Sequence, residues 1–224
     1  MPVALIIFAA FLLMHSCDSS GHNTEEGGEA STVLHDPEVN VDIHREIPAE
    51  IQQRMWPVWF DRDHFPAHED SFEMSEEQWR EKLSGREYRV LRNEGTEAPF
   101  VNEYHGEEGE GIYVCRGCSA PLFSSETKFH SSSGWPSYFA PIELTFIGVK
   151  PDHGLLSERT EVHCARCGSH LGHVFEDGPE PTGLRYCMNS LAMRFIDEEL
   201  HEMISSGRLE DLEVDLIGFK EVSK

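Results

Sequence analysis

Short apolar runs, each bounded by glycine, proline or serine, occupy the middle of the chain. Clear examples lie at residues 111–114, 121–123 and 144–149. Runs of this length between turn-forming residues are typical of β-strands, and their close spacing favours antiparallel pairing over alternating strands and helices. The pattern therefore predicts a mainly β domain, either a sandwich or a barrel of antiparallel strands.

Helical signals flank this β region. Ser75 and Gln78 have the spacing of a capping box, which predicts a short helix that Gly85 ends. Residues 48–56 and 198–204 carry apolar side chains at helical spacing. We therefore expect an amphipathic helix before the β region and another after it.

The segment at residues 31–70 combines acidic residues with large apolar ones. Val39, Val41 and Ile43 alternate with polar residues, which predicts a short strand. Four aromatic side chains follow within ten residues, namely Trp56, Trp59, Phe60 and Phe65. Because so many large rings are unfavourable in water, we expect this extension to pack on the main domain.

An uninterrupted apolar run at residues 3–14 lies near the start of the sequence. It is too short to cross a bilayer as a helix and is typical of the hydrophobic region of a signal peptide. Residues 13–17 resemble a bacterial lipoprotein cleavage box, in which Cys17 becomes the lipidated N-terminus. No Lys or Arg precedes the run, so an ordinary cleaved secretory peptide is the alternative.

These features predict an exported protein that is either periplasmic or anchored to a membrane as a lipoprotein, with Cys17 as the tether. The predicted organisation has four parts. They are a signal peptide of the lipoprotein type at 1–16, an acidic tether with a packed extension at 17–70, a main domain at 71–196, and a C-terminal extension at 197–224.

The charge balance is strongly acidic. The 224 residues include 41 Asp and Glu against 18 Lys and Arg, which gives a formal net charge of −23. Such a surface repels phosphate groups, so we expect no nucleic-acid partner and no binding to anionic lipid through surface charge.

Four of the six cysteines form two matched pairs. Cys115 and Cys118 make one C-x-x-C motif, and Cys164 and Cys167 make another. Two such turns facing each other can hold one zinc ion with four thiolates, and a closed site of this kind is structural. Two disulfides or a redox motif are the alternatives, but the matched pairs favour one structural zinc per chain.

Cys187 is the remaining cysteine of the predicted main domain. On a strand, Arg185, Cys187 and Asn189 would share one face, with Tyr186 and Met188 on the other. A guanidinium beside the thiol would favour the thiolate and lower its pKa, which indicates a reactive site. A buried structural cysteine is the alternative, and these residues alone do not decide between the two.

Three motifs together resemble one protein family. Residues 128–139 contain Gly-Trp-Pro-Ser, residues 163–175 contain the second cysteine pair and two histidines, and residues 185–190 read Arg-Tyr-Cys-Met-Asn-Ser. They are similar to the zinc-containing type of the peptide-methionine (R)-S-oxide reductases, over roughly residues 72–196. The resemblance implies two antiparallel sheets in a sandwich-like or tent-like arrangement, a four-cysteine zinc site, and a few peripheral helices.

The resemblance also implies an activity and its nucleophile. The family reduces the R epimer of methionine sulfoxide in proteins, which is a repair reaction of the oxidative stress response. Cys187 would attack the sulfoxide sulfur as a thiolate held by Arg185. Trp135 would bind the substrate methyl group on its indole face.

Three further residues would arrange the proton chemistry of that reaction. By the resemblance, His173 and Asn189 would orient the sulfoxide oxygen, directly or through water, and His170 would help to supply the proton. Asp177 matches an acidic position that helps to arrange the site.

One position departs from the pattern of many family members. Ser133 stands where they carry a second, resolving cysteine. We therefore expect the sulfenic acid on Cys187 to be reduced by an external thiol, either a thioredoxin-like or glutaredoxin-like protein or a small thiol. Two functions without turnover are the alternatives: a zinc-stabilised β module that binds a partner protein, and a thiol redox sensor.

Overall fold

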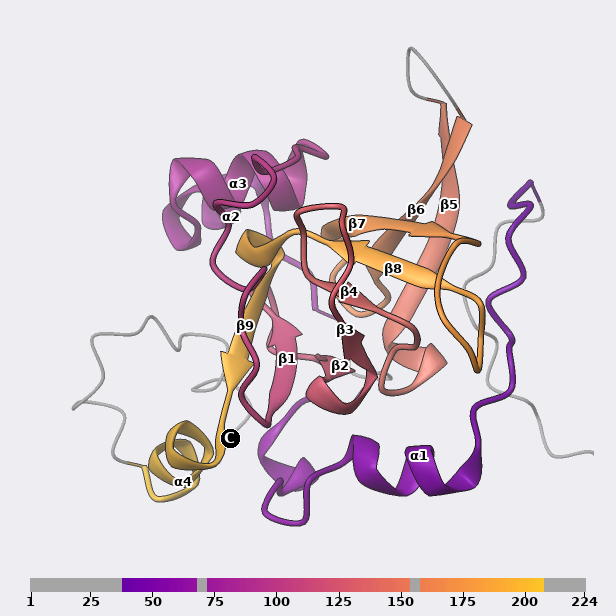
Figure 1. The fold of residues 1–224 in the computed structure, drawn as a ribbon. Helices are drawn as coiled ribbons and strands as arrows, with labels where there is room; N and C mark the ends of the chain where they lie inside the picture. Colours follow the sequence, from indigo (N-terminus) through magenta and orange to yellow (C-terminus); the bar gives the residue numbers. More distant parts are fainter. Residues whose placement is uncertain (1–37, 68–71, 154–157, 208–224) are drawn as a thin grey trace, which may run out of the picture. The chain divides into compact units, whose positions relative to one another are not determined.

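Two antiparallel sheets and four short α-helices make up the computed structural model, which describes residues 38–67, 72–153 and 158–207. The predicted signal peptide, Cys17, the acidic tether and the end of the C-terminal extension lie outside the described residues. The mainly β fold with two antiparallel sheets is confirmed. Figure 1 shows the two sheets facing each other, with the helices at the periphery.

The smaller sheet has the strand order β2-β1-β9. Its strands are β1 (Ile112–Cys115), β2 (Pro121–Ser124) and β9 (Met193–Ile196). The larger sheet has the order β3-β4-β8-β7-β6-β5. Its strands are β3 (Lys128–Phe129), β4 (Ser137–Tyr138), β5 (Ile147–His153), β6 (Glu158–Cys164), β7 (His170–Phe175) and β8 (Arg185–Met188).

The helices lie at the margins of the sheets. The α-helices are α1 (Ala49–Met55), α2 (Glu76–Lys82), α3 (Gly85–Arg92) and α4 (Glu198–Ser205). Single 3-10 turns lie at Arg62–His64, Ser125–Thr127, Leu144–Phe146 and Ser190–Ala192. Among the described residues, no helix has both the length and the apolar character needed to cross a membrane.

Local capping explains where α2 and α3 begin. The predicted capping box is present, because Ser75 and Gln78 each bind the other's backbone N–H through their side chains. The prediction that Gly85 ends a helix is wrong. Ser84 and Glu87 form a second capping box, so Gly85 is the first residue of α3.

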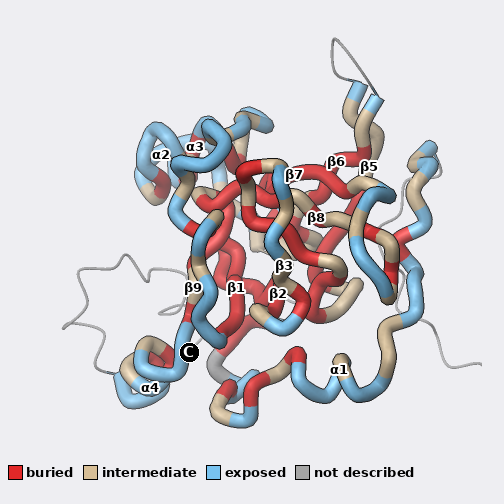
Figure 2. Tube along the Cα trace, in the orientation of Figure 1, coloured by how far each residue is buried: buried red, intermediate tan, exposed pale blue. Residues whose placement is uncertain are grey.

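The aromatic extension shares the hydrophobic core of the β domain. Met55, Phe60 and Phe65 are buried in that core, and α4 meets the extension where the ring of Phe60 lies 5.2 Å from that of His201. The predicted strand at Val39–Ile43 is wrong, since these residues follow an irregular path. Most residues of α1 are exposed or half-buried, whereas every residue of β1 and β2 is buried (Figure 2).

Aromatic rings fill the space between the two sheets. Phe123 of β2 stacks on Tyr138 of β4 at 4.5 Å, and its ring lies 5.8 Å from Tyr186 of β8. All three side chains are fully buried. Stacked aromatic pairs of this kind contribute both apolar burial and ring–ring attraction, so Phe123 joins the sheets at their centre.

Replacing Phe123 with Ala should lower the free energy of unfolding by about 3–5 kcal/mol, because the deletion leaves a cavity between the sheets. Val58→Ala is the control, because Val58 is fully exposed and its truncation should change stability by no more than about 0.5 kcal/mol. Chemical denaturation of both variants measures the difference. Equal stabilities would contradict this account of the core.

Candidate functional site

Cys187 lies in a row of directly opposed residues that crosses four strands. It pairs with Ser137 on β4 and with His173 on β7, and His173 pairs with Glu161 on β6. Directly opposed residues of antiparallel strands project from the same face of the sheet. Along β8, Arg185 and Cys187 are half-buried, and Tyr186 and Met188 are fully buried in the core. The alternation predicted for this stretch is therefore confirmed.

A cavity of about 100 Å³ opens at Cys187. It brings together four of the residues singled out from the sequence, namely Cys187, Trp135, His173 and Asn189. The remaining lining residues are Thr96, Arg159, Gly172, Phe175 and Met188. His170, Arg185 and Asp177 do not line it, although Arg185 contacts the Cys187 thiol directly.

The backbone of Glu97 positions two of the lining side chains. Its carbonyl accepts a hydrogen bond from Trp135 Nε1 at 3.1 Å, and its N–H donates to Asn189 Oδ1 at 3.0 Å. The Glu97 carboxylate accepts from Leu191 N–H at 2.9 Å, while burial raises its pKa. Asn189 Nδ2 also donates to Leu171 O at 3.1 Å, which leaves one amide proton for a ligand.

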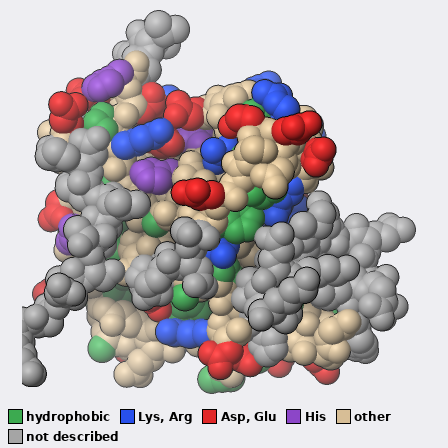
Figure 3. Space-filling model, turned by 180° about the vertical axis from the view of Figure 1, so that it is seen from behind, with side chains coloured by type: hydrophobic (Ala, Val, Ile, Leu, Met, Phe, Trp, Pro, Cys, Tyr) green, Lys and Arg blue, Asp and Glu red, His purple; other side chains and the backbone are tan. Residues whose placement is uncertain are grey.

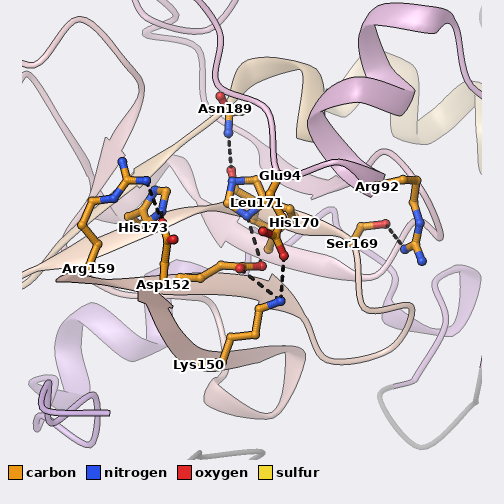
Figure 4. A network of polar contacts seen from close by, with 11 residues as sticks. Arg92, Glu94, Lys150, Asp152, Arg159, Ser169, His170, Leu171, His173 and Asn189 are labelled. Atoms are coloured by element: carbon orange, nitrogen blue, oxygen red, sulfur yellow. Dashed lines mark hydrogen bonds and ion pairs between the residues drawn. The ribbon is translucent and has the colours of Figure 1, made fainter. Parts of the chain in front are cut away.

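His173 is held by a carboxylate and a guanidinium on the β5–β6 hairpin. Its Nε2 lies 2.7 Å from Asp152 Oδ2, and Arg159 donates to the same oxygen at 2.6 Å (Figure 4). Burial lowers the pKa of His173, although Asp152 opposes this shift. For Asp152, burial acts to raise the pKa, but the contacts with His173 and Arg159 outweigh it and lower the pKa.

A second network surrounds His170. Its Nδ1 lies 3.1 Å from Glu161 Oε1 without hydrogen-bond alignment, and both residues are almost fully buried. Lys150 Nζ lies 3.2 Å from Glu161 Oε2 and 3.0 Å from Glu94 Oε1 (Figure 4). Burial acts to raise the pKa of Glu161, but His170 and Lys150 outweigh it and lower the pKa.

Arg185 forms an ion pair with Asp177 and does not line the cavity. Its Nε and Nη2 donate to the two Asp177 carboxylate oxygens at 2.8 and 2.9 Å, and its guanidinium lies over the ring of Phe175. Burial raises the pKa of the Cys187 thiol, and the contacts with Ser133 and Arg185 only partly offset it. Arg185 therefore acts in the predicted direction, but burial is the larger effect.

The four paired cysteines meet at one point. All four are buried, and their Sγ atoms lie within 4.8 Å of one another. Cys115 and Cys167 Sγ are 3.7 Å apart, and Cys118 and Cys164 Sγ are 3.6 Å apart. These distances are far longer than a disulfide bond. They match the separation of about 3.8 Å that tetrahedral geometry with metal–sulfur bonds near 2.3 Å requires.

The two cysteine turns have the same backbone geometry. Ser119 N–H donates to Cys115 O, and Gly168 N–H donates to Cys164 O, both at 2.8 Å. Ser119 and Gly168 also share a left-handed conformation, with φ of 63° and 68°. Two equivalent turns that present four thiols to one centre are suited to hold one metal ion.

Several residues of the site were not identified from the sequence. Asp152, Arg159, Glu161 and Glu97 contact or hold the predicted residues through pairing between distant segments. Their only sequence signal is a charged residue in a strand or loop segment, as at Glu161 between Thr160 and Val162. That signal is weak, because a charged residue at such a position usually faces solvent.

The SelR domain family matches residues 83–197. Among curated relatives, the peptide methionine sulfoxide reductase MsrB of Hahella chejuensis is 48% identical over 126 residues, covering 56% of this chain and 91% of the relative. The enzyme of the same name from Methanosarcina mazei is 49% identical over 131 residues, covering 58% and 94%. That from Thioalkalivibrio sulfidiphilus is 54% identical over 125 residues, covering 55% and 90%.

The matched region contains the complete cavity lining, the four clustered cysteines and both sheets. It covers half of this chain, and the pairwise matches cover nearly all of each of the three relatives. The chain therefore belongs to the SelR domain family, the family of the peptide methionine sulfoxide reductases MsrB.

Proposed function

We propose that this chain reduces the R epimer of methionine sulfoxide in oxidised proteins to methionine. The observation that carries the proposal is the cavity that joins the Cys187 thiol to Trp135, His173 and Asn189. A sulfoxide needs an apolar surface for its methyl group, a nucleophile at sulfur and a proton donor at oxygen. The cavity lining supplies one residue for each requirement, with Asn189 as a second donor.

Substrate binding places the sulfoxide between Trp135 and Cys187. The indole face takes the methyl group, and the free Nδ2 proton of Asn189 donates to the sulfoxide oxygen, directly or through water. Because Glu97 fixes both side chains, the oxygen of one epimer points toward His173. The other epimer would direct its oxygen away from these donors.

In the chemical step, the Cys187 thiolate attacks the sulfoxide sulfur. The imidazolium of His173 donates a proton to the oxygen, and Asp152 stabilises this charged form. Oxygen is transferred to Cys187, which becomes sulfenic acid, and the substrate leaves as a thioether with the sulfur electron pair restored.

External thiols complete the cycle. Among the described cysteines, only Cys187 lies outside the four-cysteine cluster. One reductant thiol condenses with the sulfenic acid, releasing water and forming a mixed disulfide, and a second thiol frees Cys187. We propose a thioredoxin-like protein, a glutaredoxin-like protein or a small thiol in this role.

Zinc is the metal we propose for the cluster of Cys115, Cys118, Cys164 and Cys167. Four thiolates favour zinc, and the full shell leaves no position for substrate, so the ion would act only on stability. Export as a periplasmic or lipid-anchored protein is likewise a proposal, based on the N-terminal sequence alone.

The separate R and S epimers of N-acetyl-methionine sulfoxide amide test the activity, with dithiothreitol as reductant and methionine formation as readout. The R epimer should be turned over and the S epimer should not. Cys187→Ser should lose at least about 10³-fold in rate, because it removes the nucleophile. Equal rates for the native protein and the variant would overturn the proposal.

The pH dependence of kcat/KM should be bell-shaped with a broad plateau. The active form needs a charged His173 and an ionised Cys187, while burial lowers the first pKa and raises the second. The population of that form is then constant between the two pKa values. Below the pKa of His173 it falls, because the thiolate fraction of Cys187 keeps decreasing while His173 is already fully charged. Above the pKa of Cys187 it falls, because the imidazolium fraction of His173 keeps decreasing while Cys187 is already fully ionised.

Asp152→Asn should lower the pKa of His173 further, because it removes the carboxylate that favours the imidazolium. The acid limb should move to lower pH, and the plateau should fall about tenfold for each pKa unit. Asp177→Asn is the matched control, since Asp177 pairs with Arg185, and it should leave the acid limb in place. An unmoved acid limb in Asp152→Asn would exclude His173 as the donor.

Elemental analysis of the purified protein should give one zinc ion per chain. Cys118→Ala should lose both metal and cooperative unfolding, because binding energy at such a site is folding energy. Cys187→Ser is the control and should retain both. A metal-free native protein that melts at the same temperature as the preparation with metal would contradict the proposed role of zinc.

A further inference from the structure

Three serine hydroxyls form a connected chain that ends at the Cys187 sulfur. Ser137 Oγ lies 2.7 Å from Ser131 Oγ, and Ser131 Oγ lies 2.7 Å from Ser133 Oγ. Ser133 Oγ lies 3.7 Å from Cys187 Sγ, within reach of a hydrogen bond to sulfur. The chain approaches Cys187 from the β4 side of the site, opposite His173.

Counting donors fixes the direction of these bonds when Cys187 is ionised. A serine hydroxyl has one proton and two acceptor positions. Ser133 Oγ accepts from Trp135 N–H at 3.4 Å and can accept from Ser131, so its own proton is left for the sulfur. Ser131 gives its one proton to Ser133, so the 2.7 Å contact between Ser131 and Ser137 uses the Ser137 proton, for which Trp135 O at 3.2 Å is the alternative acceptor. Hydroxyls linked in this way polarise one another, which strengthens the last donor.

The backbone holds this chain in place independently of substrate. Ser137 is fully buried on β4 and is paired in register with Cys187. The turn that carries Ser131 and Ser133 ends at Gly134, whose φ of 90° suits glycine. Gly134 O accepts from Phe100 N–H and from Asn102 Nδ2, both at 2.7 Å. The Ser133 hydroxyl is therefore preorganised rather than free to turn away.

We propose that Ser133 is a catalytic hydrogen-bond donor to the Cys187 thiolate, with Ser131 as the positioning residue that polarises it. This inference deepens the proposed function and rests on it. In this chain the residue at the resolving-cysteine position has a role of its own. It helps to form the nucleophile instead of resolving the product.

The same hydroxyls give the thiol proton a route out of the cavity. Cys187 S–H transfers its proton to Ser133 Oγ, Ser133 passes its own proton to Ser131, and Ser131 passes one to solvent at its half-exposed side. One proton leaves, and no bond order or electron count changes elsewhere. The two hydroxyls then rotate, so that Ser133 donates to the thiolate.

Other charged groups around Cys187 remain in place when the serines are changed. Arg185 favours the thiolate, Asp177 opposes it, and His173 and Arg159 face the sulfur across the cavity. The hydrogen bond from Ser133 lowers the pKa of Cys187 against the larger effect of burial. Removing this one hydroxyl should therefore raise that pKa without altering the other charges.

Alkylation of Cys187 by iodoacetamide measures the thiolate directly and needs no turnover. The full chain is treated between pH 6 and 10, and modification at Cys187 is followed by peptide mass spectrometry. Ser133→Ala should raise the pKa of Cys187 and slow alkylation near pH 7.5 about tenfold. Ser131→Ala should slow it about threefold, through loss of polarisation.

Two matched variants separate this role from a structural one. Ser132→Ala removes a hydroxyl from an exposed residue of the same turn and should leave the alkylation profile unchanged. Ser133→Thr retains the hydroxyl and should restore the native profile. In turnover assays, Ser133→Ala should move the alkaline limb of kcat/KM to higher pH and leave the acid limb in place.

The proposal is overturned if Ser133→Ala and the native protein give the same alkylation profile, or if Ser132→Ala shifts it equally. Because alkylation does not require substrate, these outcomes are independent of the turnover test with Cys187→Ser. If the protein reduces neither epimer but Ser133→Ala still shifts the alkylation profile, the proposed reductase activity is refuted. The proposed hydrogen bond from Ser133 to the Cys187 thiolate is then retained.

Discussion

The meeting of the four paired cysteines is the constraint on which the rest of the structure depends. One pair begins at the last residue of β1 in the smaller sheet, and the other begins at the last residue of β6 in the larger sheet, so their meeting point joins the two sheets. Strand β7 begins three residues after Cys167. The position of the cluster therefore sets where His170 and His173 lie, and the pairing of β7 with β8 then sets the place of Cys187. The cluster therefore contributes to the site by fixing the positions of these strands.

Burial raises the pKa of Cys187 and lowers the pKa of His173. It disfavours the ionised thiol of Cys187 and the charged imidazole of His173, although the proposed reaction uses both charged forms. Asp152 on the β5–β6 hairpin favours the charged histidine, whereas Arg159 opposes it, and Ser133 and Arg185 favour the ionised cysteine. Acidic and basic side chains are interspersed on the face seen in Figure 3. The local contacts in the cavity, not the net charge of −23, therefore govern its chemistry.

Sequence reasoning succeeded where the physical cause is local. The Ser75 capping box involves residues three apart, and the alternation of buried and half-buried residues along β8 follows from strand geometry. It failed where a second local signal competed, as at Gly85, because Ser84 begins another helix there. It also failed at Val39–Ile43, where alternation alone did not supply a neighbouring strand with which to pair. Apolar alternation is necessary for a strand, but backbone pairing completes it.

By itself, the sequence determined the β character of the domain, the two cysteine pairs, and the motifs that carry Trp135, His173, Cys187 and Asn189. These are short-range patterns, and each is readable within about a dozen residues. Only the tertiary structure decided which groups act on them. Asp152 reaches His173, Glu97 fixes Trp135 and Asn189, and Ser133 meets Cys187 across 54 positions of sequence. Such contacts depend on the register between strands that are distant in the sequence, and no local pattern encodes that register.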